Sequence, residues 1–304
     1  MVGVNYAGGK IVGSNKSNAT GVNISTVSNN ISNVAKTDSA ITEDTDLSSS
    51  SKMDVEAVAT AALPAMVQLN GTTTVKSSSY FGYGQSYEAT SSGTGIIVGK
   101  SDTELLIVTN AHVVDNIDNL KCVFSDGTSA SCSVKGSKSD QDIAVAAVSL
   151  SDISSDTASN IAIAELEDSS DIKVGQQVVA IGNALGEGQS VTTGIISAKD
   201  RSITVNNVTF TGLLMTDAAI NSGNSGGALL NSEGKVIAIN FAKTSSDGVE
   251  GMAYSIPVSN VKDIIDSLMT KQTRNKVSSD KAAYLGIAAV DITSNYASYY
   301  GYPV

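Results

Sequence analysis

The chain between Ala65 and Ile256 consists mainly of short apolar runs separated by polar turns. Gly, Asn, Asp or Ser residues bound most runs, which is typical of strands in a β-rich protein. The first series of predicted strands covers Ala65–Leu69, Gly95–Val98, Leu105–Thr109, Leu120–Phe124, Ala130–Val134 and Ile143–Val148. The second series covers Val178–Ile181, Gln189–Ser197, Ser202–Val205, Leu213–Thr216, Gly227–Leu230, Val236–Phe241 and Gly251–Ile256. Two successive sets of about six strands predict an all-β fold of two antiparallel six-stranded β-barrels, of the chymotrypsin/trypsin-like kind.

Helical patterns occur only at the two ends of this β-rich region. Asp54 can cap a short helix through Ala62, which Pro64 would end. Apolar residues at helical spacing over residues 258–269 predict a closing amphipathic helix. Residues 72–92 are predicted to form a long polar loop, and a flexible insertion and a regulatory contact fit this loop equally well.

These patterns divide the chain into five parts. Residues 1–52 form a disordered Ser/Thr/Asn-rich linker, because few large apolar side chains are present to offset the entropy lost on ordering. The N-terminal barrel covers residues 53–150, and the C-terminal barrel with its closing helix covers 151–270. A second linker follows over 271–282. Residues 283–304 resume β character but are too few to fold as a domain.

Composition excludes several classes of function. A formal net charge of −11 with scattered basic residues argues against nucleic-acid binding. No apolar run is long enough to span a membrane, and the first residues lack the pattern of a signal peptide. The chain is therefore either cytosolic or trimmed from a longer protein. Neither a phosphate-binding glycine loop nor a Cys/His cluster is present, so we expect no nucleotide, metal or other cofactor.

The two cysteines flank the turn sequence Asp126-Gly127. A hairpin centred on this turn would place Cys122 opposite Cys132. A cross-strand disulfide and a pair of reduced core thiols both fit that arrangement, and the reduced pair is preferred.

Ser225 carries the strongest chemical signal, because it lies in the sequence Gly-Asn-Ser-Gly-Gly. Flanking glycines permit a turn in which a serine hydroxyl points outward and neighbouring N–H groups converge on a developing oxyanion. The N–H groups of Gly223 and Ser225 would form this oxyanion hole, with Asn224 shaping the turn between them. A Gly-Ser surface turn is the alternative interpretation.

The only histidine, His112, directly follows an apolar strand and is a candidate general base. Asp142 lies at the start of another apolar strand, where its carboxylate could orient and stabilise the imidazole. Asp140 competes for that role but does not adjoin the strand. Because Ser225 belongs to the second barrel, the site would lie between the barrels.

Five segments in order resemble the HtrA/Deg family of trypsin-like serine proteases over about residues 55–270. They are Thr109–Val114, Gln141–Ala144, Val174–Asn183, Val191–Ser197 and Asp217–Leu230. The resemblance implies that His112 is the base, Asp142 its orienting partner and Ser225 the nucleophile. It also implies that Arg201 belongs to a sensor loop that reports ligand state to the active site, although a solvated turn charge fits equally well.

The resemblance carries further expectations about the whole protein. Tyr284–Ile287 looks like the opening of the family's C-terminal PDZ domain, truncated here. Members of this arrangement in Gram-positive bacteria usually carry an N-terminal membrane anchor, so residues 1–52 would tether the protease to the extracytoplasmic face of the cell membrane. Homotrimers are usual in the family, and its oxyanion loop is often disordered at rest.

The implied activity is ATP-independent endopeptidase cleavage of unfolded or damaged extracytoplasmic proteins. Four residues would flank the substrate pocket: Ile220, Ile239, Asn240 and Phe241. Because none of them is acidic, the pocket should favour small aliphatic side chains over Lys or Arg. A chaperone-like binding module with little protease activity is the alternative, whereas a secreted digestive protease is disfavoured.

Overall fold

The computed structural model describes residues 25–26, 53–76, 86–183, 188–205, 207–242 and 252–273. These residues belong to one compact unit, Met1–Thr273. Several predicted features lie outside the described residues: the middle of the predicted long loop (residues 77–85), most of the two predicted linkers and the whole PDZ-like segment 283–304. Within the first linker, Ser25–Thr26 forms a two-residue strand, β1, that pairs in parallel with β8 (Ala162–Ile163).

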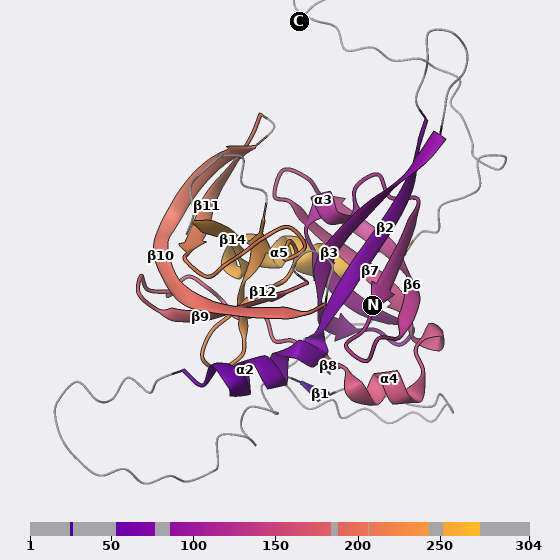
Figure 1. Cartoon of the computed structure of the whole chain (residues 1–304), viewed down its shortest axis with the longest axis horizontal. Coiled ribbons are helices and arrows are strands. Elements are labelled where there is room, and N and C mark those ends of the chain that lie inside the picture. The colour runs from indigo at the N-terminus through magenta and orange to yellow at the C-terminus, as the bar shows by residue number, and fades with distance from the viewer. Residues whose placement is uncertain are drawn as a thin grey trace, which may run out of the picture. The chain divides into compact units, whose positions relative to one another are not determined.

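The N-terminal half forms a closed six-stranded barrel (Figure 1). Its strands, in their order around the barrel, are β2 (Met66–Lys76), β3 (Ser86–Lys100), β4 (Glu104–Thr109), β7 (Ile143–Ser149), β6 (Ser129–Lys138) and β5 (Asn119–Val123). All neighbouring pairs are antiparallel. Alternate side chains such as Leu69, Ile107 and Ala146 point into the barrel and form its apolar core.

The C-terminal half forms a second closed six-stranded barrel. Its strands, in order, are β10 (Ser190–Val205), β11 (Val208–Thr216), β14 (Ala253–Pro257), β13 (Val236–Phe241), β12 (Ala228–Leu230) and β9 (Gln177–Gly182). The predicted fold of two antiparallel β-barrels with a C-terminal helix is therefore confirmed.

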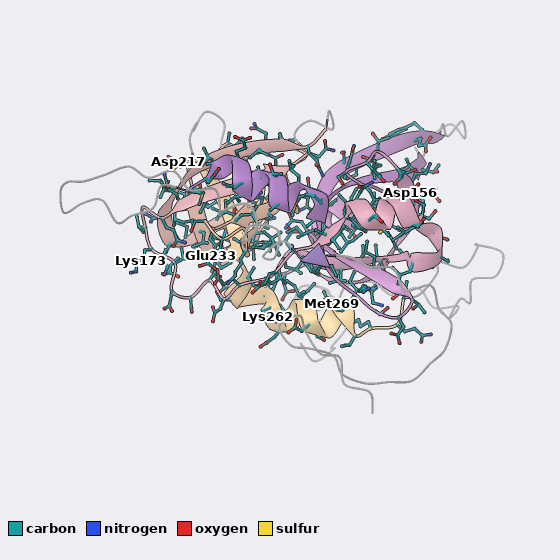
Figure 2. All side chains as sticks on the ribbon, turned by 90° about the horizontal axis from the view of Figure 1, so that it is seen from below. Asp156, Lys173, Asp217, Glu233, Lys262 and Met269 are labelled. Atoms are coloured by element: carbon teal, nitrogen blue, oxygen red, sulfur yellow. The ribbon has the colours of Figure 1, made fainter. Side chains whose placement is uncertain are left out.

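Two longer helices pack against the barrels. Asp54 caps α2 (Val55–Ala62) by accepting a 3.0 Å hydrogen bond from the Ala57 N–H, as its sequence position predicts. The closing helix α5 (Val258–Met269) contacts β6 and β7 of the first barrel as well as β13 and β14 of the second. Figure 2 shows this helix running from Lys262 to Met269 along the lower edge of the view. Its buried face joins an apolar cluster contributed by both barrels.

Four short helices complete the described elements outside the strands. A 3₁₀ helix, Leu63–Ala65, follows α2 and contains the predicted stop residue Pro64. The helix α3 (Ala111–Val114) lies directly after β4, where it carries His112. A 3₁₀ turn, Leu150–Asp152, and α4 (Ser155–Asn160) connect the two barrels.

The prediction of a long loop over residues 72–92 is wrong at both ends of that range. β2 continues to Lys76 and β3 begins at Ser86, with Thr72 opposite Thr90 in an antiparallel ladder. Threonine-rich segments suit an extended strand, although polarity on both faces hides the alternation that marks a half-buried strand. Tyr87 lies on β3 with 58% of its surface exposed.

The predicted break between residues 197 and 202 is also wrong, because β10 runs through it without interruption. The pairing with β11 shifts register on either side of Ala198 and Arg201. Asp200 adopts a positive φ of 55° within this irregularity. A β-bulge therefore accommodates the polar residues that the sequence suggested as a turn.

The hairpin carrying the cysteines has a different register from the one expected. Cys122 pairs with Ala130, and Cys132 pairs with Leu120, so the two cysteines lie diagonally rather than opposite each other. The hairpin loop is tighter than predicted, since the Thr128 N–H donates to Asp126 Oδ1 and the Phe124 N–H donates to the Thr128 carbonyl. Both cysteines are buried free thiols.

Candidate active site

The structure brings His112, Asp142 and Ser225 together where the two barrels meet. His112 Nδ1 lies 2.7 Å from Asp142 Oδ2, and His112 Nε2 lies 3.1 Å from Ser225 Oγ. An ionised carboxylate only accepts hydrogen bonds, so Nδ1 carries the proton and Nε2 is left to accept from the serine hydroxyl. This is the geometry in which imidazole can take a proton from serine while the carboxylate stabilises the imidazolium.

The Asp142 carboxylate is fixed by the segment that carries His112. Its Oδ1 accepts a 2.9 Å hydrogen bond from the His112 N–H, while its main-chain carbonyl accepts from the Ala111 N–H and from Asn110 Nδ2. Asp142 adopts a φ of 52°, which turns the chain sharply just before β7. The Asp142 side chain is 5% exposed, so few water molecules can compete for its charge.

Asp140 takes a different position from Asp142. Its side chain is 58% exposed and forms a 3.1 Å ion pair with Lys138. The structure therefore places only one of the two candidate carboxylates against His112.

The turn that carries Ser225 leaves two N–H groups unused. Gly223 and Gly226 adopt φ values of 95° and 81°, which favour glycine. The Asn224 N–H donates to the Asn221 carbonyl at 2.9 Å. Among the described residues, the N–H groups of Gly223 and Ser225 have no hydrogen-bond partner. Two unpaired N–H groups beside the Ser225 hydroxyl suit the binding of an oxyanion.

Backbone hydrogen bonds to β13 also hold this turn in place. The Gly226 N–H donates to the Asn240 carbonyl at 3.0 Å, and the Asn240 N–H donates to the Gly227 carbonyl at 2.8 Å. The Asn240 side chain is fully buried and donates to the Ala228 carbonyl, while its Oδ1 accepts from Ser255 Oγ. Asn240 therefore holds the turn from within the second barrel.

The other residues predicted to flank a substrate pocket differ in exposure. Ile220 is partly buried, whereas Ile239 and Phe241 have no exposed surface and belong to the core cluster shared by the barrels. The Phe241 ring stands edge-on to the His112 ring, with centroids 6.1 Å apart and an interplanar angle of 84°. This contact helps to fix the imidazole plane.

Arg201 lies on the exposed side of β10, opposite Leu213 and next to the bulge. It forms no ion pair with any described residue. The structure thus places Arg201 on the β10–β11 hairpin.

Two polar residues near the site were missed by sequence reasoning. Thr94, on β3, contacts the Ser225 turn from the first barrel, and Asn110 holds Asp142 as described above. Both are fully or almost fully buried. The position of Asn110 two residues before His112 was a usable signal. Thr94 lies between Gly93 and Gly95, but nothing local indicates that its partner is 129 residues away.

The described residues contain no group of three or more His, Cys, Asp or Glu side chains that could hold a metal ion. In the same part of the chain, no helix combines the length and apolarity that crossing a bilayer requires.

Comparison with known proteins identifies the family. A family model described as a trypsin-like peptidase domain matches residues 93–239. The serine protease Do-like HtrA of Bacillus subtilis is 36% identical over 238 residues, which cover 75% of this chain and 50% of that protein. The periplasmic serine endoprotease DegP of Salmonella typhimurium is 36% identical over 216 residues, which cover 70% and 42% respectively. Among solved structures, the HtrA-type protease AlgW with decapeptide is 29% identical with a TM-score of 0.57, and the match covers 82% of this chain and 76% of that one.

The chain spans about half the length of the curated relatives it matches. The region that the family model matches nevertheless contains all three residues, His112, Asp142 and Ser225. From the fold of two closed barrels and from these matches, we conclude that the chain belongs to the HtrA/Deg family of trypsin-like serine proteases.

Proposed function

We propose that the chain is a serine endopeptidase that hydrolyses peptide bonds through an acyl-enzyme. One observation carries the proposal: a single imidazole lies 2.7 Å from a buried carboxylate and 3.1 Å from a serine hydroxyl. The unpaired N–H groups of Gly223 and Ser225 support it, because tetrahedral intermediates of acyl transfer need such donors.

In the proposed reaction, Ser225 Oγ attacks the carbonyl carbon of the scissile bond while His112 Nε2 takes the hydroxyl proton. The oxygen of the tetrahedral intermediate accepts from the N–H groups of Gly223 and Ser225. The C–N bond then breaks as Nε2 returns its proton to the leaving amine. Water, deprotonated by the same Nε2, attacks the acyl group, and Ser225 regains its proton when the carboxylic acid leaves.

The substrates we propose are unfolded or damaged polypeptides, cleaved without ATP and after small aliphatic residues. Neither Ile220 nor β13 carries an acidic side chain that would pair with Lys or Arg at the cleaved position. The solved AlgW relative with a decapeptide supports a polypeptide substrate by similarity. A chaperone-like module with little cleavage remains the alternative, and it would keep peptide binding without hydrolysis.

We also propose that the protein works at the extracytoplasmic face of a bacterial membrane, as a membrane-anchored homotrimer. The Salmonella relative is named a periplasmic enzyme, which supports the compartment. In this proposal residues 1–52 are the tether, residues 53–150 and 151–270 are the two barrel domains, and 283–304 begin a PDZ domain after a linker. Arg201, exposed on the β10–β11 hairpin, is the proposed sensor of bound ligand.

Casein digestion by the wild type and by Ser225→Ala tests the activity. Ser225→Ala should lower the rate on the order of 10⁴-fold or more, because the attacking oxygen is gone. Ser232→Ala, which alters an exposed serine in the turn after β12, is the matched control and should digest casein at the wild-type rate. Peptides with Val, Ala or Lys before the cleavage point extend the assay to specificity.

Equal digestion by the wild type and Ser225→Ala would refute serine catalysis. Peptide binding by a wild type that does not cleave would favour the chaperone-like alternative. Preferential cleavage after Lys would leave the activity standing and refute only the aliphatic pocket.

A further inference from the structure

Thr94 connects the first barrel to the turn that carries Ser225 through its hydroxyl and its N–H group. Its hydroxyl lies 2.7 Å from the Gly223 carbonyl, and its N–H donates to the Ser225 carbonyl at 2.8 Å. Its own carbonyl accepts from Thr109 Oγ1 at 2.7 Å, which ties Thr94 to β4. Only 1% of the residue is exposed. Water is therefore excluded from these contacts, and a polar group that loses its partner there costs free energy.

The direction of the Thr94 hydroxyl is determined by a second partner. The Asn183 N–H, at the end of β9, donates to Thr94 Oγ1 at 2.8 Å. A hydroxyl has one proton, so with Asn183 as donor that proton is directed to the Gly223 carbonyl. Asn183 Oδ1 in turn accepts from the Gly188 N–H, which connects Thr94 to the two described ends of the 183–188 segment.

These contacts fix the peptide group that lies between the two unpaired N–H groups. The Gly223 carbonyl is held by Thr94 and the following Asn224 N–H is held by the Asn221 carbonyl, so the Gly223–Asn224 peptide is pinned at both ends. Gly223 itself, at a φ of 95°, offers little steric resistance to rotation. Without the hydroxyl, this peptide could rotate and turn the N–H groups of Gly223 and Ser225 away from a common point.

We propose that Thr94 is a positioning residue, whose hydroxyl holds the Gly223 and Ser225 N–H groups in the geometry that binds the oxyanion. The inference rests on the proposed peptidase function and adds a residue to its machinery. Thr94 does not touch the reacting atoms and acts through the Gly223 carbonyl. It also makes oxyanion binding depend on the contact between the barrels, because β3 and the Ser225 turn belong to different barrels.

Steady-state hydrolysis of a fluorogenic peptide ending in Val or Ala tests this role. Thr94→Val keeps the shape of the side chain and removes the hydroxyl, and we expect kcat to fall roughly 10- to 100-fold with KM changed by less than about threefold. Thr94→Ser retains the hydroxyl and should restore most of the lost kcat. Should Thr94→Val fail to fold, Thr94→Ala removes the same hydroxyl without placing a methyl group against Gly223, and it carries the same expectation.

Thr157→Val is the matched control for lost stability. Thr157 is another buried threonine, but it lies on α4 and its hydroxyl contacts Ser154 and Thr128, away from the site. Thr157→Val should lower the thermal midpoint and leave kcat unchanged. An unchanged kcat in Thr94→Val, or an equal loss in Thr94→Ser, would overturn the inference.

Amide hydrogen exchange of the full chain separates this inference from the proposed function. Without the Thr94 hydroxyl, the Asn183 and Asn224 amides should exchange faster in Thr94→Val than in the wild type, while Thr157→Val leaves them unchanged. This readout needs no catalysis. If the wild type cleaved nothing, the peptidase proposal would fail, and unchanged exchange in Thr94→Val would still overturn the positioning role.

Discussion

Single glycines set the shape of the turn that carries Ser225, and Gly226 is the most constrained of them. A Cβ atom at Gly226 would lie 2.2 Å from Thr109 Oγ1 and 2.3 Å from the Thr94 carbonyl oxygen. These two oxygen atoms are the donor and the acceptor of one hydrogen bond, so neither can move away alone without breaking it. Only glycine combines this close approach with the φ of 81°.

We therefore expect Gly226→Ala to lower the free energy of unfolding by roughly 3 kcal/mol or more and to reduce peptide hydrolysis at least about 100-fold. Gly127→Ala is its control, because Gly127 has almost the same φ, 82°, but no atom within 4 Å of the added Cβ. It should cost only about 1–2 kcal/mol and spare activity. Urea unfolding and peptide assays measure both variants. Equal losses of stability would show that backbone conformation, rather than crowding, dominates at Gly226.

At the scale of elements, strand alternation and helical periodicity were enough to predict both barrels and the helix α5. They failed where polarity hides the period, as in the extension of β2 and β3, and where a bulge interrupts it at Asp200. The register of the hairpin that carries the cysteines could not be predicted from the sequence either, because it depends on how the Asp126 side chain tightens the loop. An offset of two residues separates the predicted cysteine pairing from the observed one.

The observed hairpin makes both thiols poor nucleophiles. Burial raises the pKa of Cys132 to about 12, and burial together with the neighbouring Cys132 raises the pKa of Cys122 well above its ordinary value. We expect neither thiol of the folded protein to react with a disulfide reagent such as DTNB at pH 8, whereas both should react in 6–8 M urea. Rapid labelling of native protein would contradict this, and an absence of reactive thiols in urea would indicate a disulfide.

At the scale of the whole molecule, sequence motifs indicated His112, Asp142 and Ser225, because each lies beside an apolar strand in a chemically specific context. Their distances, and the role proposed for Thr94, depend on how two barrels pack against each other. No local pattern carries that information. The same holds for the link between β4, β6 and the segment after α5, where Glu104, Lys135 and Thr273 meet.

This link makes stability depend on pH. Burial opposes the charge of Glu104, but hydrogen bonds from Lys135 and Thr273 and the attraction of the Lys135 ammonium outweigh burial and lower the pKa of Glu104. A lowered pKa in the folded state stabilises the protein above the pKa of the unfolded state, near 4.3, and this contribution is lost as pH falls through the folded value.

Glu104→Gln should therefore be less stable than the wild type by roughly 1–3 kcal/mol at pH 7. The difference should shrink as both proteins are acidified below about pH 4. Urea unfolding at pH 7 and in the acid range measures it. A gap between the two proteins that is constant across this range would show that the charge of Glu104 contributes nothing.

Because His112 and Asp142 lie on one barrel and Ser225 lies on the other, the site is completed late in protein synthesis. His112 and Asp142 leave the ribosome with the first half of the chain, while Ser225 follows more than eighty residues later. The helix that fastens the halves to each other, α5, emerges last of the described elements. If the proposed function is right, a growing chain therefore cannot cleave itself or neighbouring proteins until nearly all of both barrels has left the ribosome.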